Sequence, residues 1–589
     1  MRLLTPVLLV LAIANAGAQI VPQFLRPSCQ RLLYCNSKLL HYVQMARVFP
    51  DSKTFVDLSL KYNEDIIFES FNRLLKETQN NPTKAQLTEF VNLNFNSTDE
   101  LEEWTPKDFK KNPEFLNSIT DGEFKQFAKD IHNLWPSLGR KIKSSVYQQP
   151  ELSSLIPLPY GFMIPGGKFR ELYYWDSYWI IRGLLVSGMH DTVKGIIGNL
   201  IYMQKQFGHV PNGGRYYYQE RSQPPLLAAM MALYVEFSDD IDFMKKNLHV
   251  IEDELEYWLD THSVAFTKNG TEYTLLRYFS PSEGPRPEAY YEDFSEAEDF
   301  DSDDRRDQFY VDIKSAAESG WDFSTRWFIN QEGPSKGNLS AIHVTDIVPV
   351  DLNAIFTNAL LNLEEFYKKL ENPRKGAHWG YLAKQWMSSM QEVLWHEEDG
   401  IWYDYDLLNE RHRNYFYLSN IAPLSMSAVH PDFVSAKAHR ILEYLNNTQT
   451  LDLPGGIPTS LFFSGEQWDY PNAWPPLMSM TVSALEVLNT PEADQIAFQV
   501  SQNWIRSAYI GYVKNNRIYK KYHVQVAGKS GLGGDFVPQR GYGWSNGVIL
   551  EMLYKYGSTL KASDVMGAAP LHPEFLVPAP EEISVYYKK

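Results

Sequence analysis

The chain has 589 residues, of which 44% are hydrophobic and 22% are charged. This composition is typical of a folded protein with a large core and argues against intrinsic disorder. The formal net charge of −17 argues against binding to nucleic acid or to anionic lipid, because both attract basic surfaces. Aromatic residues make up 14% of the chain, which suits either a well-packed core or a site where rings stack on sugars.

The first 18 residues are typical of a signal peptide. Arg2 precedes the apolar run Leu3 to Ala14, and the small residues Ala16-Gly17-Ala18 follow at the expected cleavage position. No later stretch approaches about 18 uninterrupted apolar residues, the length that a membrane span needs. We therefore expect a secreted, extracellular protein without a membrane anchor.

Two further features agree with secretion. The sequence holds four N-x-S/T glycosylation motifs, which begin at Asn96, Asn269, Asn338 and Asn446. The only cysteines, Cys29 and Cys35, lie close together, and we expect them to form one small-loop disulfide in an oxidising compartment. Two cysteines alone do not make a usual zinc site, and we expect no metal or other cofactor.

Apolar residues recur at helical spacing along most of the chain, and strand alternation is scarce. Clear examples are the segments 226–237, 352–370, 434–445 and 481–488. We predict a signal peptide over 1–18, a helical extension over 19–150, one mainly α-helical domain over 151–560 and a tail over 561–589. The acidic segment 292–307 lacks the spacing of a calcium loop, and we expect a solvated surface loop there.

Two motifs carry the chemistry. Residues 165–179 read PGGKFRELYYWDSYW, and residues 467–476 read QWDYPNAWPP. Both mix charged or amide groups, which bind hydroxyls, with aromatic rings, which cover the apolar faces of a sugar. Taken singly, each also fits a structural role, as an aromatic core helix and as a proline-stiffened surface loop anchored by tryptophans.

Together the two motifs resemble the signature segments of the trehalase family, the inverting glycoside hydrolases that split α,α-trehalose into two glucoses. Further segments resemble the family in the same order, and the match covers nearly the whole mature chain. These segments are PDSKTFVD (50–57), VPNGGR (210–215), ERSQPP (220–225), EGPRPE (283–288), ESGWDFSTRW (318–327) and GYGWSNGV (541–548). The first of them looks like the form found in animals, particularly insects. The resemblance implies an (α/α)6 toroid with the pocket at the helix ends.

The resemblance also implies roles for single residues. Asp322 corresponds to the general acid that protonates the glycosidic oxygen. The residues expected to line the sugar subsites are Lys168, Trp175, Asp176, Asn212, Arg221, Gln223, Arg286, Glu288, Gly320, Trp468 and Asp535. No metal, cofactor or nucleic acid is implied, and the expected ligand is trehalose or a related α-glucoside.

The sequence departs from the family pattern at the catalytic base. The family has a Glu in a segment reading roughly F-E-K-Y, whereas residues 519–522 read YKKY, so Lys520 occupies the base position. Lys168 replaces an Arg, and Asp535 replaces a Glu, which are milder changes. A protonated lysine has no acceptor lone pair and cannot take a proton from water. Its charge also favours the ionised form of the acid Asp322.

Three alternatives would preserve hydrolysis. The alignment of the glycine-rich loop could place another residue at the base position, Lys520 could lose its proton on burial, or Asp535 could activate the water. The sequence therefore predicts either a trehalase with an impaired or substituted base, or a catalytically inactive, trehalose-binding relative of trehalases.

Overall fold

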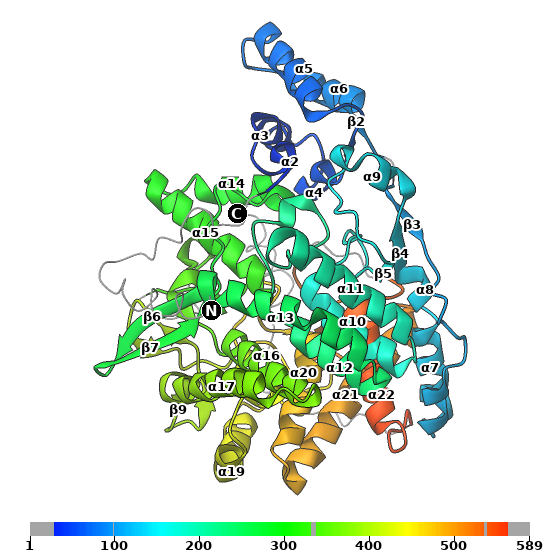
Figure 1. Cartoon of the computed structure of the whole chain (residues 1–589), viewed down its shortest axis with the longest axis vertical. Coiled ribbons are helices and arrows are strands. Elements are labelled where there is room, and N and C mark those ends of the chain that lie inside the picture. Colours follow the sequence, from blue (N-terminus) through cyan, green and yellow to red (C-terminus); the bar gives the residue numbers. More distant parts are fainter. Residues whose placement is uncertain (1–28, 98, 331–336, 535–538, 564–589) are drawn as a thin grey trace.

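The computed structural model describes residues 29–97, 99–330, 337–534 and 539–563 (Figure 1). The expected signal peptide, nearly all of the expected tail and Asp535 lie outside these residues. Among the described residues, no helix is both long enough and apolar enough to cross a membrane.

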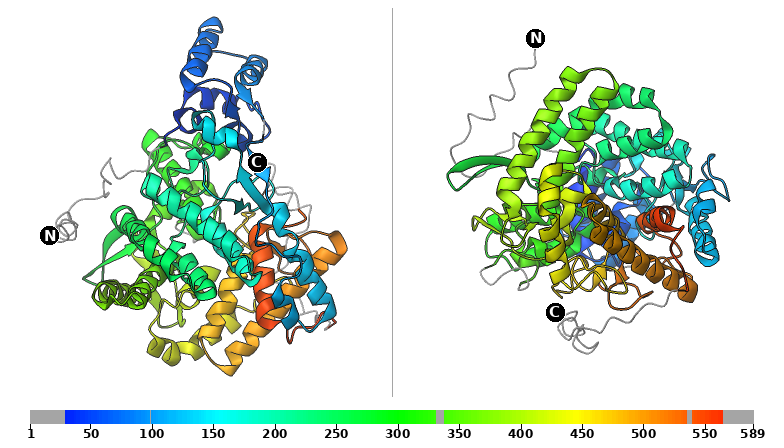
Figure 2. Two further views of the ribbon diagram at one scale, coloured as in Figure 1. Left: turned by 45° about the vertical axis from the view of Figure 1, so that its right-hand side comes forward. Right: turned by 90° about the horizontal axis from the view of Figure 1, so that it is seen from below.

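Six helices form a closed inner ring. Each of them contacts the next, and the last contacts the first. They are α10 (Tyr174–Val186), α12 (Leu227–Ser238), α16 (Val350–Lys369), α18 (Ala422–Ser425), α20 (Pro475–Val487) and α22 (Gly543–Tyr556). They alternate along the chain with six outer helices: α7 (Gly122–His132), α11 (His190–Phe207), α13 (Ile241–His262), α17 (Pro373–Leu394), α19 (Pro431–Asn447) and α21 (Pro491–Asn515). The protein is therefore an (α/α)6 toroid, as expected, and Figure 2 shows the ring from below.

The sequences of the two rings differ as their surroundings require. In α12 the run Leu227–Met231 is buried on every side of the helix. In α13, by contrast, exposed polar residues recur at steps of three and four, at Lys246, His249, Asp253 and Glu256, while Leu248 and Leu255 are buried. An all-apolar helix belongs inside, and an amphipathic helix belongs outside. The helical segments predicted over 226–237, 352–370, 434–445 and 481–488 are confirmed as α12, α16, α19 and α20.

The ring closes through a glycine contact between α10 and α22. A Cβ atom on Gly183 would lie 2.5 Å from the Cα of Gly547, and one on Gly547 would lie 2.1 Å from the carbonyl oxygen of Trp179. The two helices pack so closely that neither position has room for a side chain.

The N-terminal residues 29–96 form a smaller helical unit that projects from the toroid (Figure 1). It consists of α2 (Leu32–Cys35), α3 (Lys38–Met45), α4 (Ser52–Val56), α5 (Glu64–Glu77) and α6 (Lys84–Asn94), with an antiparallel pair of β1 (Ser59–Leu60) and β2 (Phe95–Asn96). It has its own core, which also takes in three tyrosines of the toroid: Tyr173, Tyr217 and Tyr218. The smaller unit therefore packs on the toroid through apolar contacts.

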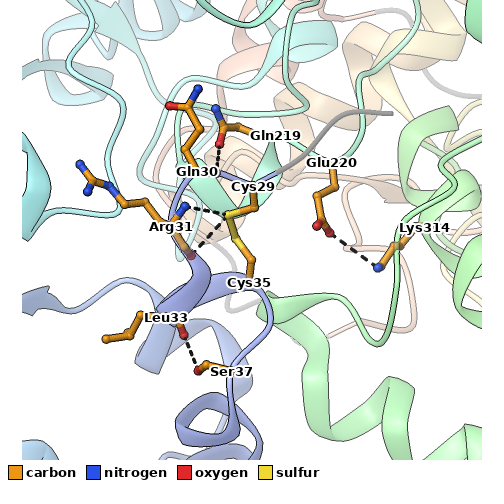
Figure 3. Close-up of a disulfide and its surroundings, with 9 residues drawn as sticks. All are labelled: Cys29, Gln30, Arg31, Leu33, Cys35, Ser37, Gln219, Glu220 and Lys314. Atoms are coloured by element: carbon orange, nitrogen blue, oxygen red, sulfur yellow. Dashed lines mark hydrogen bonds and ion pairs between the residues drawn. A yellow bond between two sulfur atoms is a disulfide. The ribbon is translucent and has the colours of Figure 1, made fainter. Parts of the chain in front are cut away.

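A disulfide joins Cys29 to Cys35 at the start of this unit. Next to it, the backbone N–H of Gln30 donates to Oε1 of Gln219 at 2.8 Å (Figure 3). The turn that the disulfide closes is thus tied to the toroid segment that leads to Arg221.

The remaining strands are short. They form the sheets β3-β4-β5 (Leu101–Glu103, Gly139–Ile142, Phe162–Met163) and β12-β11-β8 (Arg411–His412, Tyr405–Asp406, Ile347–Val348) and the pairs β9-β10 (Trp395–His396, Ile401–Trp402) and β13-β14 (Asn472–Ala473, Tyr522–His523). The longest pair is the hairpin β6-β7 (Ser263–Lys268, Thr271–Leu276). Its turn residues Asn269 and Gly270 both have positive φ, as tight hairpin turns require. Two short helices, α8 (Trp135–Leu138) and α9 (Ser144–Gln148), complete the link from α7 to α10.

The prediction of a solvated loop over 292–307 is wrong. Most of this segment lies in α14 (Tyr290–Ala297) and at the start of α15 (Asp303–Ser319). Ser302 caps α15 by accepting from the backbone N–H of Arg305, and two aspartates in the first turn complement the helix dipole. Asp293 is buried and binds Arg286, so one of the acidic residues is part of the interior.

Among the asparagines that begin glycosylation motifs, Asn269, Asn338 and Asn446 are exposed, and Asn96 is partly buried in β2. Asn269 lies exposed in the turn of the β6-β7 hairpin. Glycosylation at these positions stays a prediction.

Candidate active site

A cavity of about 250 Å³ lies where the N-terminal ends of α10, α12, α20 and α22 meet. Residues at or before the starts of these helices form part of its wall, and residues from other segments, such as 286–289 and 317–322, form further parts. Most of the expected site residues line it: Lys168, Trp175, Asp176, Asn212, Arg221, Gln223, Arg286, Glu288, Gly320, Asp322, Trp468 and Lys520. Asp535 lies outside the described residues, and its role stays a prediction.

Backbone hydrogen bonds fix the first turn of α10 at the cavity wall. The backbone N–H of Trp175 donates to Oε1 of Gln223 at 2.9 Å, and that of Tyr174 donates to the carbonyl oxygen of Asn212 at 3.1 Å. These bonds satisfy N–H groups that a helix start leaves without partners. They also bring Asp176, Asn212 and Gln223, which are distant in sequence, to one surface.

Two buried arginines are held by carboxylates. Arg221 lies 2.5 Å from Glu288, and the guanidinium of Arg286 donates two bonds, of 2.7 and 2.8 Å, to Asp293. Such charge-assisted bonds fix the planar guanidinium groups in orientation. Arg221, Arg286 and Glu288 thus present preset hydrogen-bonding groups to the cavity.

Gly320 ends α15 in a left-handed conformation, with φ +82°. A Cβ atom there would lie 2.6 Å from the ring of Trp175, so only glycine allows this approach. Asp322 follows two residues later. Gln467 donates to the carbonyl oxygen of Asp322, and the backbone N–H of Trp468 donates to that of Phe323 at 3.0 Å. The second signature motif therefore holds the backbone that carries Asp322.

A group of tryptophans forms the apolar part of the cavity. Trp468 stacks on Trp474 with ring centroids 3.8 Å apart and on Trp321 at 5.3 Å. Trp175 lies tilted against Trp468 at 5.8 Å. Trp175 and Trp468 line the cavity, so part of its wall is apolar, as suits the C–H surface of a sugar ring.

Lys520 lies in this cavity and not on the outer surface. Its ammonium group lies 4.9 Å from the ring centre of Phe169 and 5.3 Å from that of Trp474, within cation–π range. Trp544 donates its indole N–H to the carbonyl oxygen of Lys520 at 3.1 Å, and Ser545 bonds to that of Tyr519. The first turn of α22 thereby fixes the backbone that carries Lys520.

The ionisable groups of the cavity perturb one another. Burial raises the pKa of the Asp322 carboxyl, although Lys520 and Arg286 oppose this shift. Burial raises the pKa of Asp176 to about 7, again against Lys520. Burial and the neighbouring Lys521 lower the pKa of Lys520 well below its usual range, while Asp322 and Asp176 act in the other direction. A perturbed set of this kind is typical of functional sites.

The sequence interpretation missed several residues of the cavity wall. They are Lys53, Pro165, Phe169, Tyr173, Tyr218, Ala289, Ala317, Gln467, Gly534, Tyr542 and Trp544. Many of them lie in the segments that carried the resemblance, such as Gln467 in QWDYPNAWPP and Trp544 in GYGWSNGV. Lys53 comes from the N-terminal unit. In the sequence, only its place in the segment PDSKTFVD, which resembles the family, could have pointed to a role at the cavity.

Comparison with known proteins agrees with this geometry. The family model described as Trehalase matches residues 47–557. Trehalase of Bombyx mori is 52% identical over 93% of this chain and 95% of its own length, and trehalase of Tenebrio molitor is 44% identical over 94% and 100%. Human trehalase is 40% identical over 94% of both chains.

A solved structure supports the fold. The neutral trehalase Nth1 of Saccharomyces cerevisiae superposes with a TM-score of 0.53 at 21% identity, over 67% of this chain and 74% of its own. The family match spans both the N-terminal unit from residue 47 and the whole ring, and the signature segments meet in one cavity. The chain therefore belongs to the trehalase family.

Proposed function

We propose that this protein binds α,α-trehalose in the cavity and hydrolyses it only slowly at neutral pH. The observation that carries this proposal is the position of Lys520. It lines the same cavity as Asp322 and the subsite residues. The sequence resemblance assigns it to the position of the family's carboxylate base.

The binding half of the proposal rests on the cavity walls. Arg221 and Arg286 are each fixed by a carboxylate and can hold sugar hydroxyls with set geometry. Trp175 and Trp468 supply apolar surface. None of the bonds that hold these groups involves Lys520. A positive charge at the base position therefore leaves most contacts to a bound disaccharide intact.

The catalytic half follows from the chemistry of inversion. One group must protonate the leaving oxygen while another takes a proton from water on the opposite face of the sugar. We assign the first role to Asp322, whose raised pKa suits a proton donor. A lysine ammonium cannot fill the second role, and the loss of a general base costs on the order of 10²–10⁴ in rate.

The same site favours one second candidate, an active hydrolase in which Lys520 itself is the base. Burial and Lys521 lower the pKa of Lys520 well below its usual range, so a neutral amine with a free lone pair would form more easily here than in water. In that case hydrolysis by the wild-type protein would rise with pH as Lys520 loses its proton, and Lys520→Met would abolish it.

The test combines binding and turnover. Trehalose affinity is measured by calorimetry, and glucose release is measured for the wild type, Lys520→Glu, Lys520→Met and Asp322→Asn. The exposed Lys514, at the end of α21, gives a matched control as Lys514→Met. We expect all variants to bind trehalose, and Lys520→Glu to release glucose ~10²-fold faster than the wild type. Fast hydrolysis by the wild type that Asp322→Asn abolishes would contradict the proposal and favour the second candidate.

We further propose that the protein is a secreted glycoprotein. The signal-peptide pattern over 1–18, the exposed asparagines Asn269, Asn338 and Asn446 and the disulfide Cys29–Cys35 support an extracellular location. Digestion of the secreted protein with an endoglycosidase, followed by mass spectrometry, tests the glycosylation, and N-terminal sequencing tests the cleavage.

A further inference from the structure

The cavity holds a proton donor, Asp322, and a lysine, Lys520, at the position where a hydrolase has its carboxylate base. Asp322, Lys520 and Lys168 all line this cavity. Lys168 and Lys520 thus give the cavity two amino groups that bind anions when they are protonated. Water needs a base before it can attack a sugar, whereas a nucleophile that is already an anion needs no base and is bound by cations.

We propose that inorganic phosphate replaces water as the nucleophile, so that the protein is an inverting trehalose phosphorylase. This inference rests on the proposed binding of trehalose and deepens it by naming the second substrate. Phosphate would bind beside Lys520 and Lys168, on the face of the sugar where a hydrolase activates water.

The surroundings of Lys520 suit an oxyanion. Gly534, which has no side chain, lines the cavity, so the glycine-rich loop 528–534 presents backbone there. The loop is anchored at three points: Lys521 donates to the carbonyl oxygen of Gly533 at 2.6 Å, Gly531 donates to that of Lys521 at 3.0 Å, and the N–H of Leu532 donates to Asn472 at 2.7 Å. Lysine together with the backbone of a glycine loop is a recurrent phosphate-binding combination.

The reaction balances without a base. An oxygen of hydrogenphosphate bonds to the anomeric carbon of one glucose from the face opposite the leaving group. The bond from that carbon to the glycosidic oxygen breaks, the electron pair stays on this oxygen, and Asp322 gives it a proton. The products are β-D-glucose 1-phosphate and glucose, and the proton released by hydrogenphosphate returns to Asp322 through solvent. Nothing is oxidised or reduced.

Bound phosphate would also raise the pKa of the acid further. Lys520 and Arg286 favour the ionised form of Asp322, which cannot donate. A bound dianion offsets these cations and favours the protonated carboxyl, as the missing carboxylate base would have done. A single bound ligand thus supplies both the nucleophile and the second negative charge of the site.

The experiment uses the full secreted chain with trehalose, in phosphate or in chloride of equal ionic strength. Products are identified by ³¹P NMR, and glucose is measured separately. We expect phosphate to raise glucose release ~10²-fold or more, with one β-glucose 1-phosphate formed for each glucose. Lys520→Glu should lose this phosphate dependence, Lys168→Met should raise the KM for phosphate, and Lys514→Met should behave as the wild type.

The outcomes separate this inference from the proposed function. If calorimetry shows trehalose binding but phosphate yields no glucose 1-phosphate, the inference is wrong and the proposed binding stands. If trehalose does not bind with or without phosphate, both are wrong. Formation of the α-anomer would also overturn the inference, because attack opposite to the leaving group inverts the anomeric carbon. Product identification on the wild type does not depend on whether Lys520→Glu folds.

Discussion

Lys53 connects the N-terminal unit to the cavity, and we predict that Lys53→Met weakens both the docking of this unit and trehalose binding. Lys53 lies on α4 and is 3% exposed. Its ammonium group lies 2.8 Å from Glu171 and 2.6 Å from Asp57. Glu171 is fully buried and also accepts bonds from Arg215, at 3.0 Å, and from the hydroxyl of Tyr173. Lys53 therefore belongs to a buried ionic network that begins in one unit and ends in the other.

The pKa of Glu171 sets the size of the effect. Burial raises this pKa, but Lys53 and Arg215 outweigh burial and hold it at about 2, against an ordinary value of 4.5. At about 1.4 kcal/mol per pH unit, the network stabilises the ionised form by roughly 3 kcal/mol, shared between two cations. Removal of Lys53 should cost on the order of 2 kcal/mol, less than the loss of the whole network, since Arg215 stays in place. A lowered carboxyl pKa stabilises the folded state above pH 4.5. The loss of stability in Lys53→Met should therefore be complete at pH 7 and become smaller as the pH falls from 4.5 toward 2.

The assay is thermal unfolding followed by tryptophan fluorescence, together with calorimetric titration of trehalose. Lys53→Met should lower Tm by about 1–3 °C and raise the Kd for trehalose about 3–10-fold. Lys53→Arg keeps the positive charge and should retain most of the wild-type Tm and trehalose affinity. Lys84→Met, at an exposed lysine of α6, is the matched control and should change neither. Unchanged Tm and Kd in Lys53→Met would refute the argument that this network couples the N-terminal unit to the cavity.

Three further predictions concern stability. Burial raises the pKa of Glu254 to about 8, so the folded state holds a proton there that the unfolded chain releases near pH 4.5. The stability of the wild type should therefore fall as the pH rises from 5 to 8. Glu254→Gln should remove this fall, so that the Tm of the variant exceeds that of the wild type by an amount that grows with pH. Gly547→Ala should cost about 1–3 kcal/mol by overpacking the contact between α10 and α22, whereas Gly122→Ala, with no atom within 4 Å of the added Cβ, should not lower Tm. Replacement of Cys29 and Cys35 by serine should destabilise the N-terminal unit by about 2 kcal/mol, and unchanged resistance to limited proteolysis would contradict this.

Much of the ring and about half of the cavity wall could be predicted from the sequence. Apolar spacing predicted α12, α16, α19 and α20, because buried helices impose a regular pattern on their residues. The cavity residues in segments 165–179 and 467–476 were expected because the two motifs together resemble the signature segments of the trehalase family.

The parts that were missed depend on contacts between distant segments. Lys53 reads as an ordinary charged residue, and only the docking of α4 on the toroid buries it. The acidic segment 292–307 was assigned to a loop on composition alone, although Ser302 is a helix N-cap and Asp293 has a buried partner in Arg286. The β6-β7 hairpin did carry a local signal, Asn269-Gly270, which is a strong indicator of a tight turn between strands.

The cavity draws its walls from both ends of the chain, from Lys53 to Trp544, and this has a consequence for biosynthesis. A ribosome adds about 5–20 residues each second, and domains fold as their residues emerge. The ring cannot close until α22 emerges and packs on α10. The N-terminal unit is synthesised long before that point. A ligand of this cavity can therefore assist only the last step of folding, and a chain truncated before α22 would gain nothing from its presence.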